Sequence, residues 1–191
     1  IEKENPSLVS VDSPTQRVAK GLSNDFSTVK HSVPMLSLDK CYNQEDLQSF
    51  DDSLRKLVAE GEEIEYSIEP KFDGSSIALL YENDILVRAA TRGDGTEGED
   101  ITQNAKMILN IPQKVNFSKF GISKIELRGE VVIENSVFKN LNKNREKEGI
   151  KTFENSRNTA SGSLRMKNPN EVAKRGLEAF IYQVGYLTDL D

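Results

Sequence analysis

Apolar and polar residues alternate along several short stretches of the chain, and this pattern predicts β-strands. In one stretch, Ile64, Tyr66 and Ile68 alternate with charged or hydroxyl-bearing side chains. The predicted strands are residues 64–69, 76–81, 85–91, 124–133 and 177–187. The second and third are separated by a Glu-Asn-Asp turn and are therefore predicted to form a hairpin. A short apolar stretch, residues 32–38, is predicted to be extended and buried.

Helical spacing of apolar residues predicts one clearly amphipathic helix. Asn43 is a candidate N-cap, and Gly61 can end the helix. Its apolar positions are Leu47, Phe50, Leu54, Leu57 and Val58. Shorter helices are predicted at 99–109 and 135–148, and a long ordered loop or broken helix at 151–170.

Strands and helices do not follow one another in a βαβ rhythm. The sequence therefore favours an α+β fold with antiparallel sheets flanked by helices. Residues 1–30 are polar and contain two prolines and a glycine, so an irregular N-terminal arm is predicted there. Residues 31–191 would then form the folded domain.

Composition and charge exclude several classes of protein. The 191 residues carry a formal charge of −6, which argues against a bulk electrostatic binder of nucleic acid. Cys41 is the single cysteine, so an internal disulfide or a cysteine-based zinc site is excluded, and a reducing cytoplasm fits. His31 is the single histidine and argues against multi-histidine metal enzymes. No apolar run approaches the ~20 residues needed to cross a bilayer, so no membrane partner is expected.

The densest chemical signal is Glu69-Pro70-Lys71-Phe72-Asp73-Gly74. Strand parity places Glu69 and Lys71 on one polar face, with Lys71 where the predicted strand ends. A lysine there can act as a nucleophile if its pKa is lowered from about 10.4 by desolvation or by nearby cations. The alternative is an ordinary surface lysine at a hairpin end.

A glycine-rich loop with several acidic residues spans residues 91–102. Such a loop can bring backbone N–H groups towards a phosphate, but it lacks the lysine of a nucleotide P-loop and its carboxylates repel anions. Arg92 is the candidate ligand contact, because its planar guanidinium suits hydroxyl or phosphate oxygens. The alternative is an ordinary acidic turn.

Two further segments combine charge with a defined position. In residues 126–130, Glu126, Arg128 and Glu130 share one strand face, either as a solvated surface or as a ligand floor where Glu130 contacts a ribose or a metal. Residues 151–175 hold six basic and two acidic residues, a local charge of +4 that leaves −10 for the rest. This segment suits phosphate contact, or is a solvated loop.

The order and spacing of these segments resemble the bacterial NAD-dependent DNA ligases. The shared motifs are Asp12–Val18, His31–Leu38, Lys71-Phe72-Asp73-Gly74, Thr91–Gly95, Gly98–Thr102, Leu127–Val131, Asn155–Leu164 and Tyr182–Gly185. The Lys-x-Asp-Gly motif is also found in ATP-dependent ligases and capping enzymes. The Thr-Arg-Gly-Asp-Gly loop and the Arg-Asn-x-Ala-x-Gly-Ser-Leu segment are more specific to the NAD-dependent branch.

The resemblance implies a function and a set of roles. Such ligases transfer AMP from NAD to a lysine, releasing nicotinamide mononucleotide, then to the 5′-phosphate of a DNA nick, where the 3′-hydroxyl displaces it. Lys71 would be the catalytic nucleophile. The nucleotide would be bound by Ser37, Leu38, Glu69 at the adenine amino group, Arg92 and Glu130 at the ribose, and Tyr182 stacked on adenine. Arg157 and Arg165 would contact DNA phosphates, and His31 would be a packed residue at the edge of the pocket.

The resemblance also implies cofactors, partners and a domain. NAD and Mg²⁺ are expected, with no metal ligand assigned within this chain and zinc only in a C-terminal module absent from it. A truncated nucleotidyltransferase fold, ATP-grasp-like, is expected, with residues 31–191 an adenylation domain incomplete at its C-terminal end. The partner would be nicked duplex DNA, bound by a monomeric cytoplasmic, nucleoid-associated enzyme of DNA replication and repair. The fragment alone is expected to be inactive as a ligase.

Two alternatives stay open. One is an ATP-dependent ligase or a capping-type nucleotidyltransferase, against which the 157–164 segment argues. The other is a non-catalytic DNA-binding or scaffold module that keeps the fold. The presence of Lys71, Asp73, Arg92 and Glu130 argues against this second alternative.

Overall fold

The computed structural model describes residues 26–59 and 61–189, and they fall into two compact units. The helix unit comprises the described residues of Leu36–Lys71. The sheet unit comprises the described residues before and after it, 26–35 and 72–189. Each unit is described by itself below.

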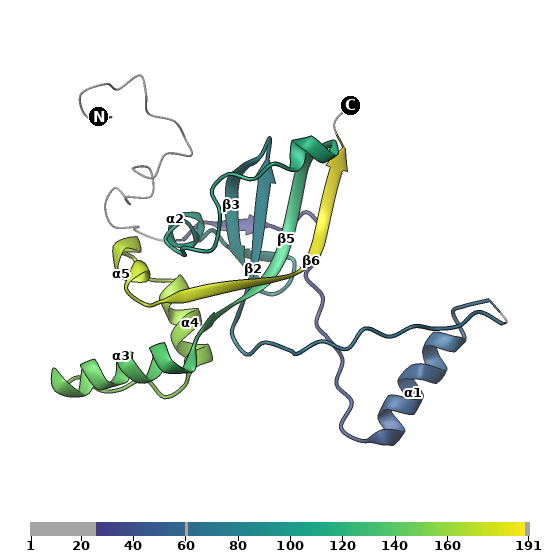
Figure 1. Cartoon of the computed structure of the whole chain (residues 1–191), viewed down its shortest axis with the longest axis horizontal. Helices are drawn as coiled ribbons and strands as arrows, with labels where there is room; N and C mark the ends of the chain where they lie inside the picture. Colours follow the sequence, from purple (N-terminus) through teal and green to yellow (C-terminus); the bar gives the residue numbers. More distant parts are fainter. Residues whose placement is uncertain (1–25, 60, 190–191) are drawn as a thin grey trace. The chain divides into compact units, whose positions relative to one another are not determined.

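A four-stranded antiparallel sheet forms the centre of the sheet unit (Figure 1). Its strands are ordered β3-β2-β5-β6 and comprise β2 (Ser75–Glu82), β3 (Ile85–Thr91), β5 (Ile122–Ile133) and β6 (Leu177–Asp189). Four of the five predicted strands are therefore confirmed within one to two residues. The predicted hairpin is also confirmed, because β2 and β3 join through Asn83 and Asp84, both with positive φ. The antiparallel α+β arrangement follows from these pairings.

Alternation along the central strands divides the sheet into an apolar face and a partly polar face. Ile77, Leu79 and Tyr81 point to one face and are almost fully buried in the main core cluster. On the other face of β2, Ser76 is paired in register with Glu130 of β5. The polar face therefore carries the charged residues that the sequence places on β5.

Helices complete the core of the sheet unit. They are α2 (Thr102–Ala105), α3 (Asn135–Lys147), α4 (Ser156–Leu164) and α5 (Pro169–Ala173), with a short 3₁₀ turn, η3 (Phe117–Phe120). Ala160, Leu164 and Val172 from α4 and α5 are buried in the same cluster as the apolar face of the sheet. The Asn155 side chain accepts from Asn158 N and caps α4. The predicted broken helix at 151–170 is thus two capped helices.

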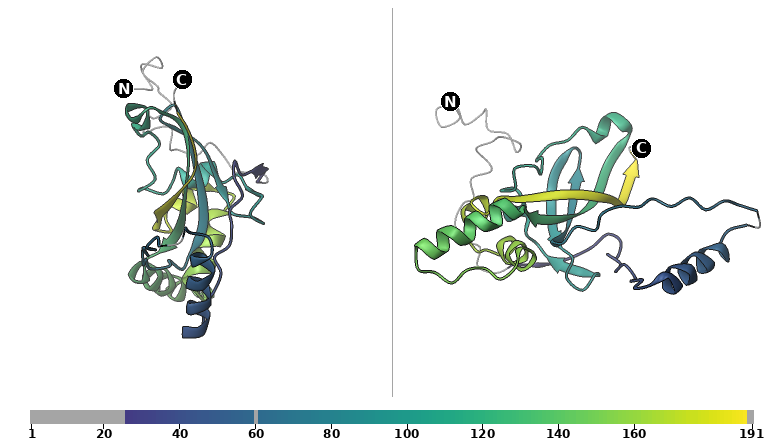
Figure 2. Two further views of the ribbon diagram at one scale, coloured as in Figure 1. Left: turned by 90° about the vertical axis from the view of Figure 1, so that its right-hand side faces the viewer. Right: turned by 60° about the horizontal axis from the view of Figure 1, so that its bottom comes forward.

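The long strands β5 and β6 bend sharply, as Figures 1 and 2 show. The register of this pair shifts between Glu126 and Leu127 and again between Arg128 and Gly129. Tyr182 falls between the residues paired with Arg128 and Gly129, so it is the extra residue of a β-bulge. A bulge increases local twist and redirects a side chain, and bulges are frequent beside functional sites.

The N-terminal end of the sheet unit contains one short strand. β1 (Thr28–Lys30) pairs antiparallel with β4 (Glu97–Glu99). Of the predicted irregular arm, residues 1–25 lie outside the described residues.

Three expectations about local structure are wrong. Residues 64–69 form no strand, because no strand lies among the described residues of the helix unit to pair with them, and Ile68 is 96% exposed. The predicted helix at 99–109 is reduced to α2, since residue 99 belongs to β4. The stretch 32–38 is not buried throughout: Met35 is buried, but Leu36 and Leu38 are exposed. The predicted amphipathic helix is confirmed as α1 (Gln44–Arg55), capped by Asn43, but it ends at Arg55 and so excludes Leu57 and Val58.

Candidate functional site

The charged face of β5 is buried. Glu126, Arg128 and Glu130 are 1%, 5% and 7% exposed, which rules out the solvated surface that the sequence left open. Glu126 and Arg128 form an ion pair with 3.1 Å between Oε1 and Nη2. Buried charges are tolerated when they are paired and hydrogen-bonded. The Glu126–Arg128 pair is buried, paired and hydrogen-bonded, so it is part of the structure beneath the polar face of the sheet.

The ion pair holds the segment that follows β1. Arg128 donates to the carbonyl oxygens of Pro34, at 3.0 Å, and Val33. The Glu126 carboxylate accepts from the backbone N–H of Ser32 at 3.4 Å. Residues 32–34 are thereby fixed against the polar face of the sheet.

The glycine-rich loop is a tight connection between β3 and β4. The Asp94 carboxylate accepts from the backbone N–H groups of Thr96 and Glu97, at 2.8 and 2.9 Å, and these bonds lower the pKa of Asp94. His31 Nε2 lies 3.1 Å from the carbonyl oxygen of Arg92. Asp94 therefore folds the loop, and the loop presents Arg92 rather than a row of free N–H groups.

Gly98 allows this connection to close. A Cβ at this position would lie 1.8 Å from the carbonyl oxygen of Thr91 and 3.2 Å from His31 Nε2. We expect Gly98→Ala to destabilise the protein by about 1–3 kcal/mol, because the backbone must shift to admit the methyl group. The matched control is Gly162→Ala on α4, where a Cβ meets nothing within 4 Å and alanine favours the helix. Urea unfolding of both variants checks this, and equal stability would contradict it.

A cavity of about 210 Å³ lies where β2, β3, β5 and α4 meet. Its charged lining residues come from widely separated parts of the chain: Arg92, Glu130, Arg157 and Arg165. The other lining residues are Gly74, Ser75, Ser76, Thr91, Gly93, Asn158 and Ser161. Three guanidinium groups beside one carboxylate suit a ligand with phosphate and hydroxyl groups. We call this cavity the arginine pocket.

Two charged groups of the arginine pocket, Glu130 and Arg165, are oriented by neighbouring side chains. Glu130 accepts a hydrogen bond from Ser76 Oγ at 2.9 Å. Arg165 pairs with Glu99 and donates to Ser161 Oγ at 2.6 Å. These contacts hold the side chains in place before any ligand binds, which reduces the entropy lost on binding.

The chain that follows Lys71 is also tied to this pocket. Asp73 pairs with Arg157 at 3.4 Å, although both side chains are largely exposed. Gly74 passes so close to β5 that a Cβ would lie 2.2 Å from the carbonyl oxygen of Val131. Glycine is therefore needed at this position for packing against the protein's own backbone.

Tyr182 lies next to the arginine pocket. Partial burial raises the pKa of its phenol, and the negative charge of Glu130 raises it further, whereas a hydrogen bond with Ser76 lowers it. These effects place the Tyr182 hydroxyl near Glu130 and Ser76. Tyr182 is 49% exposed, so its side chain is accessible to a ligand.

The structure brings together one part of the predicted site. Glu130, Arg92, Arg157 and Arg165 line the arginine pocket, and Tyr182 lies beside Glu130. The other four predicted residues, Ser37, Leu38, Glu69 and Lys71, belong to the helix unit. There Glu69 accepts from Ser67 Oγ at 3.2 Å, and Lys71 is exposed in a stretch without regular structure. The expectation that Lys71 ends a strand is therefore wrong.

Three residues of the pocket were missed by reasoning from the sequence. Ser76 is on the face of β2 that meets Glu130, and strand parity could have shown this. Asn158 and Ser161 lie on α4, where Ser161 follows Arg157 by four residues and precedes Arg165 by four. That spacing puts Arg157, Ser161 and Arg165 on one side of a helix. The sequence analysis allowed a loop as well as a helix in this region, so the shared side could not be inferred.

The described residues contain no group of three or more His, Cys, Asp or Glu side chains that could hold a metal ion. In the same part of the chain, no helix is both long and apolar enough to cross a membrane.

Comparison with known proteins identifies the family. The family model described as NAD-dependent DNA ligase adenylation domain matches residues 23–191. The chain is 55% identical over 187 residues to a protein named DNA ligase from Aquifex aeolicus, covering 98% of this chain and 26% of that relative. It is 53% identical over 191 residues to the DNA ligase of Persephonella marina, covering 100% and 27%, and 49% identical over 184 residues to that of Thermotoga maritima, covering 96% and 26%.

The chain thus spans about a quarter of the length of the curated relatives that it matches. The matched region includes the β2–β3 hairpin, the glycine-rich loop and the strand that carries Glu130. The resemblance seen in the sequence motifs is confirmed: this chain belongs to the NAD-dependent DNA ligase adenylation domain family.

Proposed function

We propose that this chain performs the adenylate-transfer chemistry of a DNA ligase that uses NAD and seals nicks in duplex DNA. The observation that carries the proposal is the arginine pocket. Residues from three strands and α4 gather Arg92, Arg157 and Arg165 around Glu130, in a chain of the ligase adenylation family. Such a group of charges matches a nucleotide whose phosphate must be held during transfer.

Lys71 is the proposed nucleophile. Its amine, once deprotonated, attacks the adenylyl phosphorus of NAD, and a P–N bond forms as the bond to the phosphate oxygen of nicotinamide mononucleotide breaks. The AMP then passes to the 5′-phosphate of the nick, and Lys71 is regenerated. Attack by the 3′-hydroxyl on that phosphorus forms the phosphodiester bond and releases AMP.

The proposed adenosine contacts are assigned residue by residue. Glu130, held by Ser76, accepts a hydrogen bond from a ribose hydroxyl, and Arg92 contacts the same part of the nucleotide. Tyr182 offers its ring to adenine, a contact that any base can make. Ser37, Leu38 and Glu69 complete the nucleotide contacts, with Glu69 at the adenine amino group.

Arg157 and Arg165 are the proposed contacts for phosphates of the nicked strand. Arg157 pairs with Asp73 while largely exposed, and Arg165 pairs with Glu99 while part-exposed. Exposed ion pairs contribute only about 0–1 kcal/mol, so an incoming phosphate can replace either carboxylate at small cost.

Magnesium is the expected metal ion. It is commonly held by one or two carboxylates together with substrate phosphates rather than by a protein cage. Glu130 is the one carboxylate that lines the arginine pocket, and it is assigned to the ribose, so the substrate phosphates would be the main ligands and no metal ligand is assigned within this chain. When bound, magnesium would offset the charge that develops on the transferred phosphate.

The wider assignments are part of the same proposal. Residues 31–191 form an adenylation domain with the nucleotidyltransferase, ATP-grasp-like fold. The whole enzyme would be a monomer in the bacterial cytoplasm, associated with the nucleoid during DNA replication and repair. An ATP-dependent ligase or a capping-type enzyme is the alternative.

Cofactor choice separates these functions. A full-length ligase that carries this sequence should seal a nicked duplex with NAD and release nicotinamide mononucleotide, and ATP should not replace NAD. Sealing with ATP alone would support the alternative. Absence of adenylation with either nucleotide would support a non-catalytic module.

Glu130 should contribute strongly to nucleotide use. We expect Glu130→Gln to lower the rate of self-adenylation from NAD by about 10–100-fold, since hydrogen bonds to charged groups contribute about 1.5–3 kcal/mol. The matched control is Glu178→Gln, which removes an exposed carboxylate from β6. The measurement is the single-turnover rate in the full-length ligase. A rate within twofold of the unmodified enzyme would contradict the role of Glu130.

The 191-residue chain alone should seal nicks far more slowly than the full-length ligase. Its relatives are about four times longer, and several charge-assisted contacts provided by the remaining length would be missing together. Binding of AMP to the chain should persist, because Glu130, Arg92 and Tyr182 are present. Parallel sealing and AMP-binding assays check this. Sealing by the chain at a comparable rate would show that its own residues supply all the chemistry.

A further inference from the structure

A buried asparagine on α2 is bonded to the end of α4. Asn104 is 1% exposed, and its side-chain nitrogen Nδ2 donates to the carbonyl oxygens of Leu164 at 2.6 Å and Met166 at 2.9 Å. A carbonyl oxygen can only accept, so the side-chain atom that faces both carbonyls is the amide nitrogen. Asn104 therefore holds the main chain on both sides of Arg165, which lines the arginine pocket.

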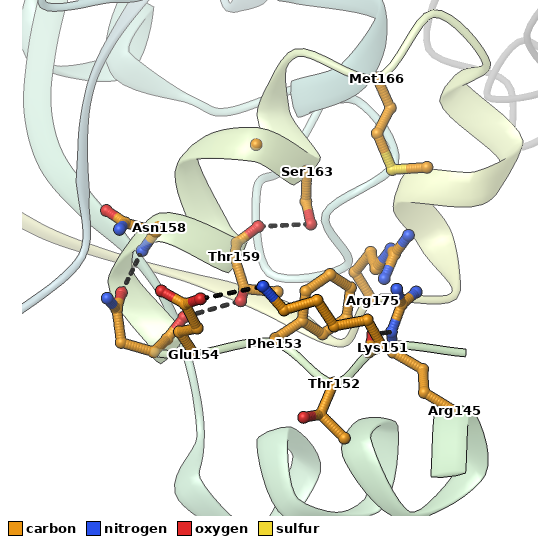
Figure 3. A pocket seen from close by; sticks show the side chains of 12 residues that line it. Arg145, Lys151, Thr152, Phe153, Glu154, Asn158, Thr159, Ser163, Met166 and Arg175 are labelled. Carbon is orange, nitrogen blue, oxygen red and sulfur yellow. Dashed lines mark hydrogen bonds and ion pairs between the residues drawn. The ribbon is translucent and has the colours of Figure 1, made fainter. Parts of the chain in front are cut away.

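The main chain at Arg165 has left the regular helix. Arg165 is the C-cap of α4, with φ −103° and ψ 15°, which departs from helical values. Carbonyl groups in the last turn of a helix lack partners within the helix and are satisfied from elsewhere. Figure 3 shows the last turns of α4 from the side of a neighbouring cavity, with Ser163 and Met166 labelled. Because the bonds at this end come from Asn104, α2 determines where the chain leaves α4.

The helix that carries Asn104 is itself tied to the strand that leads to Arg92. Thr102 Oγ1 accepts from the backbone N–H of Ala89 at 2.8 Å, and the backbone N–H of Ile101 donates to the carbonyl oxygen of Ala89 at 2.8 Å. Ala89 lies in β3, and Arg92 directly follows the end of that strand. Asn104 thus connects the two elements that deliver Arg92 and Arg165 to the arginine pocket.

The contacts of the Arg165 side chain are weaker than those of its main chain. Arg165 pairs with Glu99, and the two side chains are 41% and 38% exposed. It also donates to Ser161 Oγ at 2.6 Å. Exposed ion pairs contribute little, because water screens the charges and the long side chains lose freedom. The place of the Arg165 guanidinium therefore depends strongly on the main chain that Asn104 holds.

Stability alone does not explain an asparagine at this position. Asn104 Oδ1 is buried and has no hydrogen-bond partner among residues 26–59 and 61–189. A buried acceptor without a partner is unfavourable for folding. Local costs of this kind are expected at functional sites. The side chain is therefore of use for its two donated bonds, in spite of the unpaired oxygen.

We propose that Asn104 is a positioning residue for Arg165. Its amide fixes the end of α4 against α2 and thereby sets the Arg165 guanidinium in the arginine pocket relative to Arg92. Asn104 does not line that pocket and is buried, so it acts through Arg165 rather than by touching the substrate. The inference rests on the proposed function, because it takes Arg165 as a contact for phosphates of the nicked strand.

The test measures the sealing of a nicked duplex whose 5′-phosphate already carries AMP, so that adenylation of the protein from NAD is not needed. The protein is a full-length ligase that carries this sequence, and the duplex is kept below saturation. A misplacement of about 1 Å can lower a rate by about 100-fold. We expect Asn104→Ala to lower the sealing rate by about 10–100-fold. Arg165→Gln should lower it at least as much.

A double variant separates positioning from a general loss of structure. Because Asn104 acts through Arg165, Asn104→Ala/Arg165→Gln should seal within about threefold of the rate of Arg165→Gln alone. Losses that multiply in the double variant would overturn the inference, and so would a normal rate for Asn104→Ala. Urea unfolding shows whether each variant is folded in the assay. Asn104→Asp, which keeps the side-chain volume but lacks the amide donor, takes the place of Asn104→Ala if that variant does not fold.

The matched control is Asn110→Ala. The Asn110 side chain also forms two hydrogen bonds with main-chain atoms, the N–H and the carbonyl oxygen of Ala179 at 3.0 and 2.9 Å, but these hold β6 and not α4. Any loss of rate in Asn110→Ala should therefore multiply with that of Arg165→Gln. If the Asn110→Ala loss also vanished in the Arg165→Gln background, the coupling would not be specific to Asn104 and the inference would fail.

Separate measurements distinguish this inference from the proposed function. Normal sealing by Arg165→Gln would refute the proposed role of Arg165, and the inference with it. Slow sealing by Arg165→Gln together with normal sealing by Asn104→Ala would overturn the inference alone. Absence of adenylation from NAD in the unmodified ligase would refute the proposed NAD chemistry, whereas the comparison on the AMP-bearing nick would still decide the role of Asn104.

Discussion

Replacing Lys71 by arginine should abolish self-adenylation. Arginine keeps the positive charge and similar length, but its guanidinium does not deprotonate in proteins and so cannot attack phosphorus. Loss of a nucleophile of this kind reduces turnover on the order of 10⁴–10⁶-fold. The measurement is the amount of covalently bound AMP after incubation of the full-length Lys71→Arg ligase with NAD.

The matched control for this variant is Lys56→Arg. Lys56 is an exposed lysine of the same unit, immediately after α1, and it should adenylate at the normal rate. Lys71→Arg should also unfold at the same urea concentration as the unmodified protein, because Lys71 is exposed. Covalent AMP on the Lys71→Arg ligase in normal amount would assign the nucleophile elsewhere.

The largest effect on stability is expected from Arg128→Met. This change leaves the Glu126 carboxylate, which is 1% exposed, without its counter-charge, and the Pro34 and Val33 carbonyls without their donor. Removing one partner of a buried ion pair costs about 3–5 kcal/mol. Urea unfolding should show a free energy of unfolding lower by that amount.

A double variant tests whether the uncompensated charge is the cause. Glu126→Gln/Arg128→Met removes both charges, so it should be clearly more stable than Arg128→Met alone, although the bonds to residues 33 and 34 are still lost. Arg88→Met serves as the control, because it removes an arginine from β3 that is less buried. If Glu126→Gln/Arg128→Met were no more stable than Arg128→Met, a buried unpaired carboxylate would not explain the loss.

Most of the sheet was predictable from local patterns. In 76–81, 85–91 and 124–133 the alternation of apolar and polar residues persists because these strands have neighbours to pair with. Residues 64–69 have the same alternation, yet no strand is available to them in the helix unit. Alternation shows that a segment could be half-buried in a sheet, but pairing depends on a partner that the segment does not itself encode.

The helices of 151–173 were less predictable. α4 contains Ser, Thr, Asn and Gly, which are weak helix formers, and it is stabilised by burial of Ala160 and Leu164 against the sheet. That burial is a tertiary effect, which the composition of the segment does not report. The composition alone therefore favoured a loop as much as a helix.

The charged residues of the candidate site were predicted from motifs, but their environment was not. Alternation along the predicted strand placed Glu126, Arg128 and Glu130 on one face of the sheet. A strand face with three charged residues is ordinarily expected to be exposed to solvent. Their burial depends on residues 32–34, which lie about ninety positions earlier in the chain. The bulge that sets Tyr182 beside Glu130 likewise depends on the pairing of β5 with β6.

The most direct test of the account is to locate the AMP on the protein. A full-length ligase that carries this sequence would be incubated with NAD without DNA, digested, and mapped by mass spectrometry under conditions that preserve the phosphoramidate bond. The account predicts one adenylated peptide, modified at Lys71, which loses its AMP when a nicked duplex is added. AMP found on another residue, or no adduct from NAD while ATP produces one, would contradict it.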